Sequence, residues 1–560
     1  MLLKIITGTA KCKKSDTVAR LAAENDGLLI VPETHSLSAE KDLLKYTPAL
    51  GFGKAEVLSF RRLAHRFSDS GPLGKNMIDP AGKDMALALI CQRNLKNFRS
   101  FTRSATKTGF SKKLLSLIKE LKRYNIDPDM LRSAADAVPG RILSDKLYDI
   151  SLIYENYLAF IASGYTDSDD DLQRLYSYLC KNRPLAGRNI YIDRFSSFTG
   201  DEHMVIRALL EEAGSVTVSL SSFKGAQGFQ FASSEETIDR LEKMADELGC
   251  PHTTLVLSPD ASKEAIHLEE NLFSYSSEPY TGETDYLSLF TADSIYSEVN
   301  YVARTIRSLV RSGEADYSLI SVVCRDSETY APLLRSIFPS YEIPFTDTER
   351  LSAACHPLSV CLTSAIEAAI STASTDPILR YLKSGFSGVS QEETDLLENY
   401  MLSCGIYPSQ FFSDEKWTFK ADIYKGSKND PLLIERINKV REKILPPLLN
   451  LKNALKGKLS AEAFCRAVYA FMEETDLPSV TAGLINKYNK RGETDRAAKT
   501  ESVYNSLIRA MDSLIACSFD EVLPAQKFFS VLSEGIAAIT SSIIPSGVVC
   551  VNFASASRFK

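Results

Sequence analysis

The sequence predicts an α/β protein with two parallel-sheet domains, each interrupted by a large helical insertion. Near the start of the chain, short apolar segments alternate with helical ones, which is typical of a parallel sheet. Long stretches of purely helical periodicity follow, and short apolar segments return after each of them. The length of 560 residues allows several domains, and the 44% hydrophobic and 24% charged content is that of a folded globular protein.

The first domain is expected to be discontinuous. We assign to it residues 1–78 and 185–225, with a helical insertion at 79–184 that begins at the N-cap Asp79 and at Pro80. The expected strands of this domain are Leu2–Thr7, Gly27–Pro32, Ala55–Phe60, Asn189–Asp193 and Val216–Leu220.

The same plan is predicted a second time. Residues 226–290 are expected to form an irregular connecting segment. The second domain is assigned to 291–374 and 541–560, with strands at Leu319–Cys324 and Val548–Phe553, an extended stretch at Tyr341–Phe345 and a helical insertion at 375–540. Two RecA-like domains with helical insertions resemble the layout of superfamily-one helicases, an analogy of fold that says little about activity.

Cysteine spacing and the N-terminus argue against a metal site and a signal peptide. The eleven cysteines form no Cys-x-x-Cys pair and no zinc-finger spacing, so we expect reduced thiols and no metal site. The N-terminal apolar run is too short for a signal peptide. The long uncharged stretch Gly535–Phe553 contains Pro545, which favours strand and turn over a membrane span. We expect a cytoplasmic protein without a membrane partner.

A degenerate phosphate-binding loop follows the first expected strand. Gly8, Lys14 and Ser15 fit the spacing Gly-x4-Gly-Lys-Ser/Thr, in which backbone N–H groups and lysine hold phosphates and the hydroxyl meets Mg²⁺. Lys13 stands where the second glycine belongs, and a positive φ is costly for lysine. We expect a loop that no longer binds nucleotide; weak binding of ATP with Mg²⁺ is the alternative.

The pair of carboxylates that an active helicase needs is incomplete in this sequence. Such an enzyme uses one acid for Mg²⁺ and a second to activate water. Asp193 follows the strand Asn189–Asp193, but the next residue is Arg194. We therefore name no catalytic residue and expect no ATP-driven motor activity.

One local stretch carries a strong positive charge, although the whole chain has a net charge of −6. Between Arg93 and Arg123 there are ten lysines and arginines and one acid, Glu120. Such a stretch can bind the phosphate backbone of DNA; a merely solvated helix face is the alternative. The candidate DNA-binding residues here are Lys112, Lys113, Lys119, Lys122 and Arg123.

A second basic group opens the helix after the third expected strand. In an open parallel sheet this position lies at the carboxyl edge, where ligands bind. Phe60 or His65 can stack on a base there, and Arg62 can contact a base edge or a phosphate. The alternative places Phe60 in the core with solvated arginines around it.

Several motifs in collinear order resemble the AddB (RexB) family, the second subunit of an ATP-dependent helicase/deoxyribonuclease. Each motif is short, and together they cover nearly the whole chain. They are Leu29–Glu33, Val57–Arg66, Leu121–Tyr124, Leu143–Asp149, Ile153–Glu155, Ile190–Phe195 with Phe198-Thr199, Tyr341–Pro344, His356–Leu358 and Glu473–Asp476.

The resemblance implies a DNA-binding subunit with inactive helicase-like domains. Its partner would be an AddA/RexA-type motor subunit, its substrate single-stranded DNA or a duplex end, and its role double-strand-break repair by homologous recombination. The positions that match the reading of a recombination hotspot are Thr34, Ser36, Phe60, Arg62 and His65. The family often has glutamine in place of Thr34 and tryptophan in place of His65, so the sequence that is read would differ.

The resemblance also implies a C-terminal nuclease domain and a cysteine-held iron–sulfur cluster, which we expect outside these 560 residues. The chain ends inside the expected second domain and is interpreted as a fragment. Two other hypotheses remain open: an active superfamily-one ATPase, and a structural partner of the motor subunit that does not touch DNA.

Overall fold

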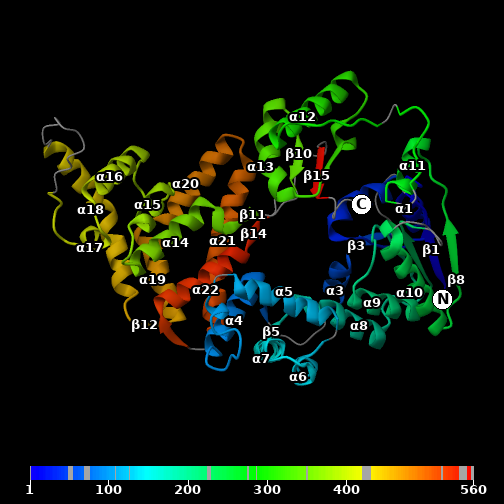
Figure 1. The fold of residues 1–560 in the computed structure, drawn as a ribbon, viewed down its shortest axis with the longest axis horizontal. Helices are drawn as coiled ribbons and strands as arrows, with labels where there is room; N and C mark the ends of the chain where they lie inside the picture. Colours follow the sequence, from blue (N-terminus) through cyan, green and yellow to red (C-terminus); the bar gives the residue numbers. More distant parts are fainter. Residues whose placement is uncertain are drawn as a thin grey trace.

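A parallel sheet of six strands forms one end of the molecule (Figure 1). The computed structural model describes residues 2–9, 11–47, 55–68, 76–107, 109–124, 126–222, 229–273, 277–284, 287–347, 351–418, 431–518, 521–541 and 551–555. The strands lie in the order β3-β2-β6-β7-β1-β8, and every pair is parallel, which confirms the predicted α/β class. Their bounds are Leu3–Thr7 (β1), Leu28–Ile30 (β2), Glu56–Leu58 (β3), Asn189–Ile192 (β6), Ser215–Leu220 (β7) and His252–Val256 (β8).

Helices cover both faces of this sheet because its central strands are apolar on both sides. On one face, α1 (Lys14–Glu24) and α2 (Ser36–Leu44) bury Val18 and Leu43 against Ile6 and Leu29. The other face is covered by α3 (Phe60–Ser68), α8 (Asp171–Asn182), α9 (Gly200–Glu212) and α10 (Ala232–Glu247).

The stretch at 226–290, predicted to be irregular, contains regular elements among its described residues. It contains α10, the sixth strand β8 and α11 (Lys263–Asn271). The strand was missed because it lies at the edge of the sheet: its residues after His252 are exposed, so it lacks the apolar run of a buried strand.

A second, smaller parallel sheet of three strands lies beside α12 (Ile295–Ser312) and α13 (Ser327–Ile337). Its order is β10-β15-β9, with bounds Phe345–Asp347, Val551–Ser555 and Ser321–Cys324. The stretch expected to be extended at Tyr341–Phe345 instead begins in a 3-10 turn, Phe338–Tyr341. Residues 548–550 of the last expected strand lie outside the described residues.

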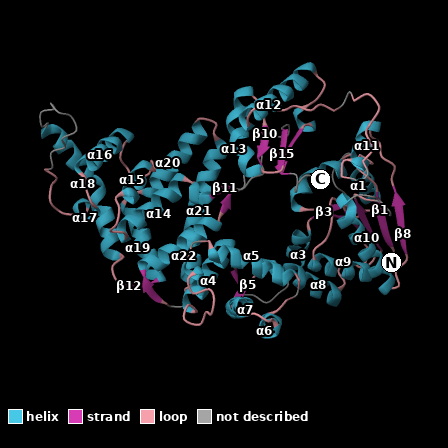
Figure 2. Cartoon of the chain, viewed as in Figure 1, coloured by secondary structure: helices cyan, strands magenta, loops and turns pink. Residues whose placement is uncertain are grey.

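The remaining helices form the other end of the molecule (Figure 2). The first group is α4 (Pro80–Arg93), α5 (Phe110–Arg123), α6 (Pro128–Ala137) and α7 (Arg141–Ala162). The second group is α14 (Pro357–Ile370), α15 (Asp376–Lys383), α16 (Gln391–Cys404), α17 (Pro408–Phe411), α18 (Pro431–Ala454), α19 (Ala461–Glu474), α20 (Leu477–Lys490), α21 (Thr494–Cys517) and α22 (Ala525–Ala538). Short two-stranded sheets accompany these helices: β4 (Asn76–Met77) with β5 (Tyr165–Thr166), β11 (Leu351–Ser352) with β14 (Thr540–Ser541), and β12 (Lys458–Ser460) with β13 (Val522–Pro524).

The two helical groups share one hydrophobic core. Met85 of α4 and Phe528 of α22 belong to the same buried cluster, and α21 and α22 both pack on α4. Gly535 packs closely on Met85, because a Cβ at residue 535 would lie 2.7 Å from the Met85 sulfur and would force that side chain to move. The groups are therefore held together by close packing. No helix in the described part of the chain is both long and apolar enough to cross a membrane.

Candidate functional site

The loop after β1 keeps the backbone form of a phosphate-binding loop. Gly8 is buried, and a Cβ there would lie 2.5 Å from the Cys12 sulfur and 2.9 Å from the Leu257 carbonyl oxygen, so only glycine fits. The Lys14 ammonium turns into the loop and donates to the carbonyls of Gly8 (2.9 Å) and Thr9 (2.8 Å). Ser15 follows in the first turn of α1.

Lys13 occupies the left-handed conformation that glycine takes at this position in intact loops. Its φ is +54°, so the positive φ that is costly for lysine is present. The Lys13 ammonium lies 2.6 Å from the Asp260 carboxylate, in the segment that follows β8. The side chain therefore leaves the loop and pairs at the surface.

Asp193 lies at the end of β6, at the same carboxyl edge as the loop. It is buried, and its carboxylate accepts a hydrogen bond from the Ser219 hydroxyl of β7, the strand between β6 and β1. The guanidinium of Arg194 lies 3.5 Å from Asp193 and 2.5 Å from Asp42 of α2. A cation, not a second carboxylate, therefore stands beside Asp193.

The structure brings four predicted base-contacting residues to one edge. Because β2 and β3 are parallel neighbours, Thr34 and Ser36 after β2 share this edge with Arg62 and His65 after β3. Thr34 and Arg62 are exposed. Ser36 is buried, and its hydroxyl oxygen has no hydrogen-bond partner among the residues that the structure describes. The Arg62 N–H donates to Ser59 just before α3.

The aromatic residue of this group is placed differently. Phe60 is only 4% exposed, and its ring packs edge-on against Phe195 (5.5 Å) and Phe198 (6.4 Å). It belongs to the core, which was the alternative interpretation of the sequence, so no face of this ring is open to a base in the structure. His65 is 44% exposed and its Nε2 lies 4.0 Å from the Asp171 carboxylate.

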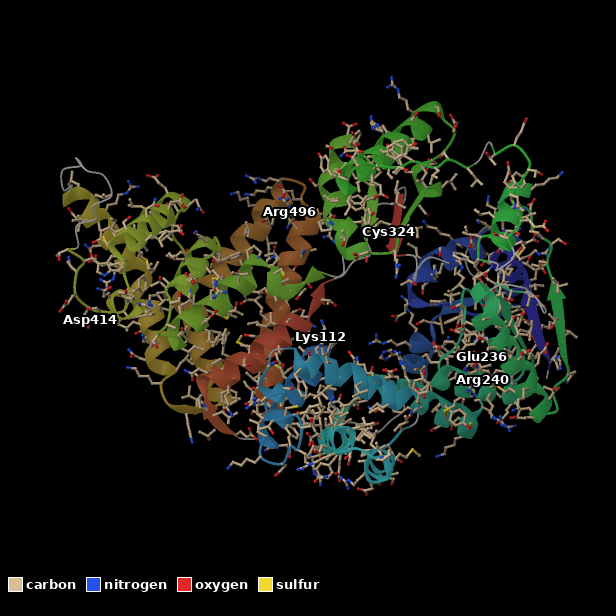
Figure 3. All side chains as sticks on the ribbon, in the orientation of Figure 1. Lys112, Glu236, Arg240, Cys324, Asp414 and Arg496 are labelled. Carbon is tan, nitrogen blue, oxygen red and sulfur yellow. The ribbon has the colours of Figure 1, made fainter. Side chains whose placement is uncertain are left out.

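The basic segment forms α5 and the loop before it. Lys112, Lys113 and Arg123 are exposed along the outer side of α5, and Lys119 is half-buried, 3.6 Å from Asp169. Figure 3 labels Lys112 near the first turn of this helix. The helix connects the two ends of the molecule: Ser111 bonds to Glu534 of α22, and the Arg123 carbonyl lies against Gly200 at the start of α9.

Lys122 does not belong to this exposed surface, contrary to the prediction. It is 8% exposed, and its ammonium lies 2.8 Å from both Asp167 and Asp170. Lys83 of α4 approaches the same Asp167 carboxylate at 2.5 Å. Burial alone would raise the pKa of Asp167, but the two ammonium groups hold that pKa well below its usual range. Lys122 is therefore a structural residue.

Helical periodicity is the signal that could have separated Lys122 from its neighbours. Ser111, Leu115, Ile118 and Lys122 follow one another at intervals of four, three and four residues, and all are buried. A count of charges ignores this spacing. The acidic run that begins at Asp167 was a second signal, because it offers partners to buried lysines in the same helical group.

Asp149 shapes the loop before α5, a role that nothing in its sequence context indicated. It is fully buried, and its carboxylate accepts the backbone N–H groups of Arg99 (2.9 Å), Ser100 (2.8 Å) and Phe101 (2.9 Å). The Arg99 guanidinium lies over the ring of Tyr148, 3.5 Å from its centre. One carboxylate thus fixes the backbone that carries part of the basic segment.

Comparison with known proteins supports the resemblance drawn from the sequence. The family model described as "ADDB, N-terminal" matches residues 5–270. The chain is 31% identical to the B-type subunit of the ATP-dependent helicase/deoxyribonuclease from Clostridium novyi (strain NT), over 97% of this chain and 49% of the relative. For the protein of the same name from Ruminiclostridium cellulolyticum the identity is 32%, over 93% and 47%, and for that from Clostridioides difficile (strain 630) it is 29%, over 100% and 51%.

These relatives match along nearly the whole chain, whereas the chain spans about half the length of the curated relatives it matches. The family model and the named relatives agree with each other and with the motifs found in the sequence. The chain belongs to the AddB family, the second subunits of ATP-dependent helicase/deoxyribonucleases.

Proposed function

We propose that this chain is a DNA-binding, catalytically silent, helicase-like component of an AddAB-type helicase/deoxyribonuclease that acts in double-strand-break repair in the cytoplasm. The exposed basic side of α5 carries the proposal. Lys112, Lys113 and Arg123 are solvent-exposed there, and such cations bind a phosphate backbone through release of its counterions. A motor subunit of AddA/RexA type would supply the ATP-driven movement.

The residues around the loop after β1 support the proposal that this chain does not hydrolyse ATP. Hydrolysis needs a carboxylate or equivalent group to position water next to the metal-binding acid. Beside Asp193 stands Arg194, whose guanidinium also pairs with Asp42. The Lys14 ammonium is engaged by loop carbonyls. We therefore name Gly8, Lys14, Ser15 and Asp193 as remnants of a nucleotide site.

The arrangement of the two sheets supports a helicase-like organisation. We propose that the six-stranded and three-stranded sheets correspond to the two RecA-like domains, and that the helical groups are their insertions. The carboxyl edge with Thr34, Ser36, Arg62 and His65 would then face the DNA strand and read bases of a hotspot sequence, because ligands of such sheets bind at that edge.

The test is DNA binding at several salt concentrations. For the variant Lys112→Glu, Lys113→Glu, Arg123→Glu we expect weaker binding of a single-stranded oligonucleotide. Its slope of log K against log salt should be shallower by roughly 2, at about 0.7 for each lost phosphate contact. Lys487→Glu, Lys490→Glu, Arg491→Glu, at the end of α20, is the control that makes the same change in net charge. An unchanged slope in the α5 variant would show that this side of α5 is only solvated.

Two rival functions have their own readouts. An active ATPase is favoured by the loop backbone, since Lys11 and Lys13 both keep a positive φ. ATP turnover in the presence of single-stranded DNA that disappears in Lys14→Ala would establish it; we expect no turnover. A purely structural partner of the motor subunit would bind no DNA at any salt concentration.

A further inference from the structure

One stretch of the chain is strongly acidic in sequence. Between residues 232 and 293 the sequence has fourteen aspartates and glutamates but only three lysines and arginines, whereas the whole chain has 71 acids and 65 bases. In the structure this stretch forms α10, β8 and α11, which we call the acidic face. Figure 3 labels Glu236 and Arg240 on α10, to the right of Lys112 of α5. Phosphate groups are repelled by such a face.

The acidic face contains a free strand edge. β8 is the last strand of the sheet, and none of the described strands pairs with its outer side. The Leu257 N–H donates to Thr7 (2.8 Å), and the Leu3 N–H donates to Pro251 (3.0 Å), so odd-numbered residues face β1. In a parallel ladder alternate residues point to opposite sides. The backbone groups of Thr254 and Val256 therefore point outward, available to another strand.

Apolar side chains accompany this edge. Leu255 is 52% exposed, Val256 58% and Leu272, just after α11, 60%. The other five strands of the sheet are largely buried, so β8 is an exception within its own sheet. A natural edge strand is usually protected by basic side chains, proline or a covering element. The strand His252–Val256 contains neither lysine nor proline. An edge strand without these protecting residues is expected where a partner covers the edge.

Carboxylates lie directly beside the strand. The Thr254 hydroxyl donates to Glu242 of α10 at 3.5 Å, and His252 lies 3.4 Å from Asp246. Glu236 and Asp239 lie on the exposed side of the same helix. A segment that pairs with β8 would meet these carboxylates at its flank, and positive side chains in that segment would be attracted to them.

We propose that β8 is a docking edge for an extended, basic and apolar segment of a protein partner, which continues the six-stranded sheet. Backbone hydrogen bonds to Thr254 and Val256 would supply the pairing, Leu255 and Leu272 the apolar contact, and the acidic face the preference for lysine and arginine. The partner to which we commit is the companion motor subunit; this identification rests on the proposed function, while the docking edge itself does not depend on DNA binding.

The experiment measures binding of this chain to the purified companion subunit. Thr254→Pro removes the outward N–H without removing a hydrogen bond to β1, and Thr254→Val keeps that N–H as the matched control. Glu242→Lys with Asp246→Lys reverses the charge beside the edge. Asp414→Lys with Glu415→Lys makes the same change in net charge and is its control; Figure 3 labels Asp414 at the opposite end of the molecule. Circular dichroism verifies that each variant is folded.

We expect Thr254→Pro and the charge reversal each to weaken binding by about tenfold or more, and both controls to stay within about twofold. Binding of the oligonucleotide should stay unchanged in all four variants, which separates failure of this proposal from failure of the DNA-binding one. Equal affinity for the companion subunit in wild type, Thr254→Pro and the charge reversal would overturn the docking edge. Loss of DNA binding in the charge reversal would overturn the assignment to a protein. If Thr254→Pro does not fold, the charge reversal decides alone.

Discussion

Replacement of Asp167 by asparagine should destabilise the helical part of the molecule. Asp167 is 1% exposed and accepts the ammonium groups of Lys83 and Lys122, which are 3% and 8% exposed. Loss of one member of a buried ionic cluster leaves charges without compensation and costs about 3–5 kcal/mol. In the variant Lys83 still pairs with Asp169 (2.9 Å) and Lys122 with Asp170 (2.8 Å). We therefore expect the free energy of unfolding to fall by the lower value of this range, about 3 kcal/mol.

The assay is urea unfolding followed by fluorescence of Trp417, the single tryptophan, which belongs to the same core as α4 and α5. The pKa of Asp167 is lowered in the folded chain. Its contribution is therefore fully present above the unfolded pKa of about 3.9 and is lost as the pH falls through the lower folded value. The free-energy difference between wild type and Asp167→Asn should be constant near pH 7 and should shrink below about pH 4.

A matched variant is Arg132→Ala, which breaks an exposed ion pair with Glu155 at 2.6 Å. Solvent screens that pair, so its unfolding curve should coincide with that of wild type. The reasoning about the buried cluster would be refuted if Asp167→Asn unfolded at the wild-type urea concentration at pH 7.

Three further outcomes are expected. In Asp149→Asn, amide hydrogens of Arg99 to Phe101 should exchange faster, because the charged acceptor contributes about 1.5–3 kcal/mol; equal exchange rates would argue against it. Cys180 and Cys355 are exposed and should be alkylated first at pH 8, whereas burial raises the pKa of Cys91 to about 12 and should leave it unmodified, as mass spectrometry would show. In Arg62→Ala, selection from a randomised single-stranded library should lose sequence preference while general affinity remains; identical selection would exclude base reading by this residue.

Buried strands could be predicted from the sequence because the two faces of a parallel sheet need apolar residues. Leu3–Thr7, Leu28–Ile30 and Asn189–Ile192 fall within the predicted ranges for this reason. β8 has no such requirement, since its side chains face solvent and its pairing depends on the backbone of β1. Local sequence patterns carry no information about that backbone pairing.

Burial of single residues at the site was harder to predict than the elements that carry them. Phe60 ends a predicted strand, but whether its ring faces DNA or the core depends on Phe195 and Phe198, which come from the far side of the first helical insertion. Lys122 counts as one more positive charge in the sequence, yet its environment is set by Asp167 and Lys83. Such contacts between distant segments decide which charges remain at the surface.

Arg194 is relevant to two parts of the proposed function, the absence of ATP hydrolysis and the reading of bases. The same guanidinium that lies beside Asp193 also bonds to Ser38 and Asp42 of α2, the helix that begins at Ser36. In an active motor a carboxylate at this position would activate water and move with the nucleotide state. Here the residue is a fixed cation, and it ties the end of β6 to the helix that opens the carboxyl edge. Arg194, which we propose leaves the chain without the acid that activates water, thus also holds in place the edge that we propose to read bases, as a fixed reading surface requires.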